Sequence, residues 1–202
     1  MVRAGLRKIG WLLSGFLLSC SLLPAQPPAQ LDSSGKIVIA GQSTPYLIRH
    51  LPVSSFPGLP APLQELLNQR KCLIPQTYQA RQPENAVHAS LERAGSSDWA
   101  VLCSSRGTVT LLVFFSSAPS TLIELASAAE TDRLQPNGSS GTLGFNWGID
   151  PASPEQVHQA QAGLNHHPPL VDHDALADSV VDHRTVYRFY RKGAWVKLDS
   201  AV

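Results

Sequence analysis

The chain has 202 residues, and its 16 Lys and Arg against 15 Asp and Glu leave a formal net charge of +1. The basic residues are scattered along the chain, so the charge pattern does not predict a surface for a nucleic-acid backbone. Hydrophobic residues make up 43% of the chain, and its length suits one domain that can bury a sizeable core. No period typical of a solenoid or propeller is visible.

The beginning of the chain has the three parts of a secretory signal. Arg3, Arg7 and Lys8 form a basic start without an acid, and an apolar stretch then leads to the small residue Ala25. Glycine and serine interrupt this stretch and Pro24 ends it, so it falls short of the roughly 20 apolar residues that cross a bilayer. We therefore expect cleavage of residues 1–25 after Ala25 and export to the periplasm or the cell exterior.

A competing interpretation places a lipid anchor at Cys20. The stretch LLSC, residues 17–20, resembles a bacterial lipoprotein box, in which the cysteine becomes the lipidated first residue. Leu18 stands where that box has a smaller residue, so we favour the signal peptide. Removal of residues 1–25 takes away three basic residues and no acid, which leaves a net charge of −2.

The exported part predicts a short leader and one folded unit. Residues 26–35 are rich in Pro and Ser and predict a flexible leader, and residues 36–202 predict a single α+β domain. In chain order we expect a strand over 36–41, a helix over 63–71, a strand over 85–92, a hairpin over 98–115 turning at Gly107, a strand over 120–127, a helix capped by Ser153, and a hairpin over 184–198 turning at Lys192 and Gly193. Together these elements predict an antiparallel sheet of about five to seven strands with two or three flanking helices.

The acidic stretch before the last hairpin predicts another helix. Asp174, Asp178 and Asp182 recur at intervals of four, with apolar residues between them, as on the wet face of an amphipathic helix over residues 172–183. A calcium loop of the EF-hand type is excluded because Ala177 stands where that loop has Gly and a histidine where it has Glu.

Two cysteines remain after the signal. Cys72 and Cys103 form an even pair in an oxidising compartment, and a disulfide between them would stabilise the fold by roughly 3.5 kcal/mol. The alternatives are two buried thiols, or a nucleophilic cysteine with a histidine partner. No activating motif accompanies either cysteine, so we expect the disulfide.

A histidine and aspartate cluster is the candidate metal site. Imidazoles and carboxylates are zinc ligands, and the candidates are His167, Asp172, His173 and Asp174, with His166 and His183 nearby. No HExxH or paired-cysteine spacing supports the site. The serine elbow of acyl-transfer enzymes is absent as well, and no catalytic residue and no cofactor is predicted.

The glycine-rich stretch NGSSGTLGFNWGID, residues 137–150, is the candidate ligand-binding loop. It lacks both glycine motifs that cradle phosphates. Its aromatic residues Phe145 and Trp147 could stack on a sugar or anchor a partner protein. The alternative is that both rings fold back over the sheet as a lid.

The stretches KCLIPQ, DWAVLCSSRGTVTLLVFF and HDALADSVVDHRTVYRFYRKGAWVKL carry a family resemblance. Over residues 63–198 the chain resembles a group of uncharacterised exported bacterial proteins. The resemblance implies an extracytoplasmic α+β domain and no site residues. The DWAV strand also looks like part of a blade in the FG-GAP/VCBS propeller repeat, but that repeat's calcium loop is missing before Asp98 and only one copy occurs.

Together these patterns predict a non-catalytic exported domain. Its expected partner is an envelope protein or glycan, bound through the glycine-rich loop. The alternative is a metal-dependent hydrolase that uses the cluster of His167, Asp172, His173 and Asp174.

Overall fold

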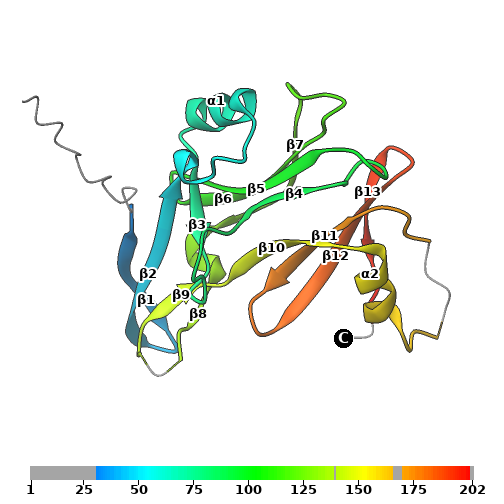
Figure 1. Cartoon of the computed structure of the whole chain (residues 1–202). Coiled ribbons are helices and arrows are strands. Elements are labelled where there is room, and N and C mark those ends of the chain that lie inside the picture. The colour runs from blue at the N-terminus through cyan, green and yellow to red at the C-terminus, as the bar shows by residue number, and fades with distance from the viewer. Residues whose placement is uncertain (1–30, 139, 166–169, 201–202) are drawn as a thin grey trace, which may run out of the picture.

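The computed structural model describes residues 31–138, 140–165 and 170–200, coloured along the chain in Figure 1. Within these ranges 13 strands form one sheet of nine and one of four, and two α-helices accompany them. The predicted signal peptide, residues 1–25, and the alternative anchor at Cys20 lie outside the described residues. No helix of the described part has the length and hydropathy that a membrane crossing requires.

The larger sheet has the strand order β7-β6-β5-β3-β2-β9-β8, with β1 on β2 and β4 on β5. Its strands are β1 (Ser33–Ile39), β2 (Gln42–Pro52), β3 (Leu73–Gln76), β4 (Ala86–Ala89), β5 (Asp98–Ser105), β6 (Thr108–Phe114), β7 (Leu122–Ala129), β8 (Leu134–Pro136) and β9 (Leu143–Phe145). All its pairs are antiparallel except β2 with β9, which is parallel. The sheet is therefore mixed.

The smaller sheet is antiparallel in the order β10-β11-β12-β13. Its strands are β10 (Trp147–Ala152), β11 (Ala175–Val180), β12 (Arg184–Arg191) and β13 (Ala194–Leu198). The α+β class is confirmed, but the prediction of one sheet with about five to seven strands is wrong. Strands of three or four residues, such as β3, β8 and β9, are too short to show an alternating pattern.

The predicted helix over residues 172–183 is wrong, because this stretch contains strand β11. Residues four apart share a face in a strand as well as in a helix, so the aspartate spacing fits both structures. Three consecutive residues decide between them: Ala175, Leu176 and Ala177 have exposed fractions of 0%, 0% and 8%. A strand covered on both faces buries such a run, and β11 lies between β10 and β12.

The start of the domain also differs from the prediction. Strand β1 begins at Ser33 and pairs with β2 through a turn at Ala40 and Gly41. Residues 33–35, the last three of the predicted leader over 26–35, therefore belong to the sheet, and residues 26–30 lie outside the described residues. The backbone amide of Leu31 already donates to the carbonyl oxygen of His50 on β2.

The two sheets pack face to face between two helices (Figure 1). Leu102 and Leu111 of the larger sheet share one core with Ile149 and Leu176 of the smaller sheet. Helix α1 (Ala61–Gln69) covers the outer face of β5 and β6 with leucine side chains. Helix α2 (Pro154–Gln161) packs Val157 against the outer face of the smaller sheet. The resulting layers are helix, sheet, sheet and helix.

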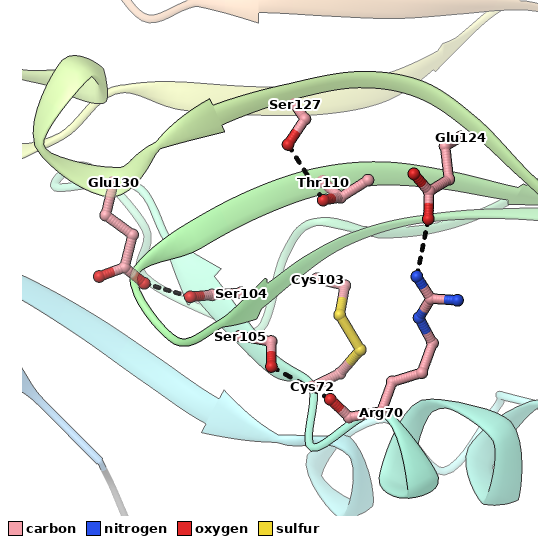
Figure 2. The surroundings of a disulfide bond; sticks show 9 residues. All are labelled: Arg70, Cys72, Cys103, Ser104, Ser105, Thr110, Glu124, Ser127 and Glu130. Atoms are coloured by element: carbon pink, nitrogen blue, oxygen red, sulfur yellow. Dashed lines mark hydrogen bonds and ion pairs between the residues drawn. A yellow bond between two sulfur atoms is a disulfide. The ribbon is translucent and has the colours of Figure 1, made fainter.

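The predicted disulfide is confirmed. Cys72 follows α1 and bonds to Cys103 on β5, with a Cα–Cα distance of 5.1 Å (Figure 2). Both half-cystines are buried, each with 4% of its surface exposed. The bond ties the end of α1 to the centre of the larger sheet, and it indicates that the protein folds in an oxidising environment.

Candidate functional site

A surface hollow of about 390 Å³ lies where the glycine-rich loop meets the loop after β3. It is lined by Leu47, Arg49, Gln76, Thr77, Tyr78, Asn137, Ser140, Thr142 and Leu143. This volume is within the range of small-molecule pockets, about 300–1,000 Å³. None of the lining residues is acidic, and one of them carries an aromatic ring. The hollow is therefore a neutral to weakly basic site with one aromatic side.

Tyr78 is held at its hydroxyl by hydrogen bonds from two directions. Its hydroxyl donates to Asp182 Oδ2 at 2.7 Å and accepts from Gln135 Nε2 at 2.6 Å. Gln79 Nε2 donates to the same Asp182 oxygen at 2.6 Å. Desolvation and the hydrogen bond with Asp182 raise the pKa of Tyr78, so the phenol stays protonated. With the hydroxyl occupied, the ring is the part of Tyr78 that is left for a ligand.

Gly144 lets the glycine-rich loop approach Tyr78. A Cβ added at Gly144 would lie 2.4 Å from Cβ of Tyr78, which is closer than side chains tolerate. The amide of Tyr78 donates to the carbonyl oxygen of Phe145 at 2.9 Å, so backbone and ring are held together. Gly144 is thus required because another chain segment passes closely over it.

Three polar groups at the hollow are available to a ligand. The side-chain amide of Asn137 and the hydroxyl of Thr142 have no hydrogen-bond partner among the described residues, and Asn137 is exposed. Arg49 donates one N–H to the carbonyl oxygen of Ala80 at 2.7 Å and keeps its other donors. Gln76, by contrast, is buried and its amide is occupied by backbone groups. The available groups therefore come from the loop and from β2.

The interpretation of Phe145 and Trp147 as ligand-binding rings is wrong. Their exposed fractions are 1% and 0%, and both rings lie in the core between the two sheets. Trp147 Nε1 donates to Asp178 Oδ1 at 2.6 Å, and the guanidinium of Arg133 lies 4.2 Å from the ring centroid. Arg188 binds the other oxygen of Asp178 at 2.6 Å. The ring and the N–H of Trp147 therefore both have partners inside the protein. This agrees with the alternative that Phe145 and Trp147 fold back over the sheet.

The candidate metal cluster is only partly brought together. His173 Nδ1 and Asp172 Oδ1 lie 2.7 Å apart, and this hydrogen bond holds the pKa of Asp172 below its usual range. Asp174 faces elsewhere and accepts from the amide of Ser90 at 2.9 Å. His167 lies outside the described residues. In the part of the chain that the structure describes, no three His, Cys, Asp or Glu side chains form a set that could hold a metal ion.

His173 itself is poorly placed to bind a metal. Its exposed fraction is 9%, and its buried Nε2 has no hydrogen-bond partner among the described residues. Its ring packs on Phe189 with centroids 4.3 Å apart. With Nδ1 bound to Asp172, only the buried Nε2 is left for a metal. The pair therefore fastens a loop to β12.

A buried His, Glu and Ser network was not predicted from the sequence. Glu130 Oε1 lies 2.8 Å from His50 Nε2 and also accepts from the hydroxyl of Ser104. Burial raises the pKa of Glu130, but the bonds from His50 and Ser104 outweigh that effect and lower it. The hydroxyl of Ser104 bonds to the carboxylate of Glu130 and not to the imidazole of His50. No histidine is therefore placed to take the proton of Ser104 and activate it as a nucleophile.

Among known proteins, no family model, no curated protein and no solved structure matches the chain. The predicted membership of a group of exported bacterial proteins therefore stays a prediction. The geometry of the site carries the functional argument alone.

The glycine-rich loop that the sequence singled out borders the hollow, but Phe145 and Trp147 do not. Tyr78 stands in the stretch TYQARQ, which has no periodicity and no motif. The only available signal was Gly144, because a glycine between two bulky apolar residues marks a place where another segment approaches. Which segment approaches could not be read from the sequence.

Proposed function

We propose that the chain is an exported, non-catalytic domain that binds a neutral sugar unit of an envelope glycan in the hollow beside Tyr78. One observation carries the proposal: an aromatic ring, oriented through its hydroxyl, borders neutral amide and hydroxyl groups, and none of the described residues that line the hollow is acidic. An aromatic ring offers an apolar face to the C–H groups of a sugar, and the polar groups can bond its hydroxyls.

The groups around the hollow match a sugar better than a charged ligand. Asn137 offers both a donor and an acceptor, and Thr142 adds a hydroxyl that can act as either. Sugar hydroxyls also donate and accept, so each contact can be satisfied in two ways. Arg49 is the one cation among the described residues that line the hollow, and one of its N–H groups is already bound.

The site is organised before a ligand arrives. Tyr78 is held through its hydroxyl. The glycine-rich loop is closed by a hydrogen bond from the backbone N–H of Asn137 to the carbonyl oxygen of Thr142 at 3.0 Å. Groups that are already fixed lose little conformational entropy on binding. The disulfide supports the proposed location, since such bonds persist in exported proteins.

A glycan array of neutral and acidic envelope oligosaccharides, followed by calorimetry on any hit, tests the proposal. We expect the purified protein to bind neutral sugars and Tyr78→Ala to lose roughly tenfold in affinity. Tyr78→Phe, which keeps the ring but loses the hydrogen bonds that orient it, should lose less affinity than Tyr78→Ala. Tyr187→Ala is the matched control, because Tyr187 is also half-buried but lies on the smaller sheet. Failure to bind any oligosaccharide, or equal binding by Tyr78→Ala, would contradict the proposal.

A further inference from the structure

A second hollow, of about 340 Å³, lies over the disulfide on the outer face of the larger sheet. Three basic residues surround it: Arg70 and Lys71 at the end of α1, and Arg106 in the turn between β5 and β6. All three side chains are exposed. Its remaining lining is Gln69, Cys103, Ser105, Thr108, Thr110 and Leu112. The hollow therefore combines three cations with three hydroxyl groups and no lining acid.

One of the three cations, Arg70, has an ion-pair partner among the described residues. Glu124 of β7 binds Arg70 with an N–O distance of 2.7 Å, and the two side chains are 53% and 44% exposed (Figure 2). The side chains of Lys71 and Arg106 have no hydrogen-bond or ion-pair partner among the described residues. Among the described residues, the three cations thus have one ion-pair partner, the carboxylate of Glu124. Cations held close together repel one another, so an anion bound between them would be stabilised.

The end of helix α1 does not explain the whole cluster. Cations near a helix C-terminus are stabilised by its exposed carbonyl groups, which accounts for Arg70 and Lys71. Arg106 belongs to a different element and reaches the same hollow from a hairpin turn. Its presence places positive charge on two sides of the hollow.

The disulfide positions these two sides. Cys72 follows Lys71 directly, and its partner Cys103 precedes Arg106 by three residues on the other wall. The hydroxyl of Ser105 also donates to the carbonyl oxygen of Arg70 at 3.1 Å, as Figure 2 shows. Cations held apart by such cross-links do not have to be brought together when an anion binds.

We propose that this hollow binds a phosphate group. The forked donors of arginine bind two phosphate oxygens, lysine adds a point charge, and the hydroxyl of Thr108 can donate to a remaining oxygen. The phosphate can belong to free inorganic phosphate or to a phospholipid headgroup, which share this chemistry. The site is separate from the hollow beside Tyr78 and does not depend on the sugar proposal.

Calorimetric titration of inorganic phosphate into the purified chain, with its disulfide intact and at low salt, tests the site. Loss of one exposed cation should weaken binding roughly fivefold, and Lys71→Gln with Arg106→Gln together roughly 20-fold. The double variant Arg184→Gln with Lys197→Gln is the control, because it removes the same charge from exposed positions on the smaller sheet. Equal weakening by both double variants would show general charge attraction and overturn the site.

A gain of affinity provides a second readout. Glu124→Gln removes the competing carboxylate and frees Arg70, so phosphate should bind roughly threefold more tightly. Sedimentation with phosphatidylglycerol vesicles, against phosphatidylcholine vesicles as reference, distinguishes a headgroup from the free ion. Dependence of vesicle binding on Lys71 and Arg106 would support a headgroup site. Absence of binding to both phosphate and vesicles, or weaker binding by Glu124→Gln, would overturn the proposal.

Discussion

Asp98 holds together the loops at one end of the β5–β6 hairpin, and its replacement by Asn is the sharpest test of the fold. The residue is 0% exposed. Its Oδ2 accepts from the amides of Leu91 and Glu92 at 2.9 and 2.8 Å and from the hydroxyl of Ser96. Its Oδ1 accepts from the amide of Ser116 at 2.8 Å and from the hydroxyl of Ser116 at 3.1 Å. Five donors thus converge on one carboxylate.

Asp98→Asn keeps the size of the side chain and replaces one acceptor by a donor. Whichever way the amide turns, its NH₂ group faces at least one backbone N–H, which then loses its partner in the protein interior. In the cheaper orientation NH₂ replaces Oδ1, because only the amide of Ser116 is then left unpaired while the Ser116 hydroxyl can rotate. An unsatisfied buried donor costs about 1–3 kcal/mol, and the loss of charge weakens the remaining bonds. We expect a total loss of about 3 kcal/mol.

Urea unfolding at pH 7, followed by tryptophan fluorescence and far-ultraviolet circular dichroism, measures this loss. Asp132→Asn is the matched control, because Asp132 is exposed and the substitution should change the free energy of unfolding by less than about 0.5 kcal/mol. A loss below about 1 kcal/mol for Asp98→Asn, the lower end of the cost of one orphaned donor, would refute the reasoning.

Three further predictions concern the core and the disulfide. Burial raises the pKa of Asp98 and of Glu130, but hydrogen bonds to the carboxylates outweigh burial and lower both pKa values. The stability that these groups contribute is therefore present above the ordinary carboxyl pKa of about 4 and should be lost as the pH falls through the lowered pKa values of the folded state. Urea midpoints measured from pH 6 to 2 should fall accordingly, and a flat profile would contradict the prediction. Reduction of Cys72–Cys103, which are 31 residues apart, should lower the free energy of unfolding by about 3.5 kcal/mol, measured with and without reductant; an unchanged urea midpoint would speak against the bond. Trp147→Phe removes the N–H that donates to Asp178 and should lower the free energy of unfolding by about 2–3 kcal/mol, measured by thermal unfolding. Trp195→Phe, which changes a partly buried ring, should lower it by less.

The elements predicted correctly are those that local patterns specify. The hairpin of β5 and β6 turns at Arg106 and Gly107, both with positive φ, and the last hairpin turns in the same way at Lys192 and Gly193. Helix α2 begins with the capping box expected at Ser153. In each case residues within a few positions of one another supply the turn, the cap or the alternation, so the chain needs no distant partner to show the pattern.

The predictions that failed depended on distant partners. Within the helix predicted over residues 172–183, Ala175–Val180 form strand β11 because β10 and β12 pair with it. Strand β10 was not predicted from the sequence. Phe145 and Trp147 became core residues because the smaller sheet packs over them. A sheet joins segments far apart in sequence, and the free energy of burying a ring depends on which segments arrive, which no local window contains.

The sequence by itself therefore determined the α+β class, the two long hairpins, the start of helix α2 and the pairing of Cys72 with Cys103. Helix α1 begins at Ala61, two residues before the predicted start. Tertiary structure alone decided that there are two sheets, that Asp98 gathers five donors, and that Tyr78 and not Trp147 borders the glycine-rich hollow. The physical reason is that caps and turns are short-range interactions, whereas burial and the meeting of side chains at a surface arise only when remote strands come together.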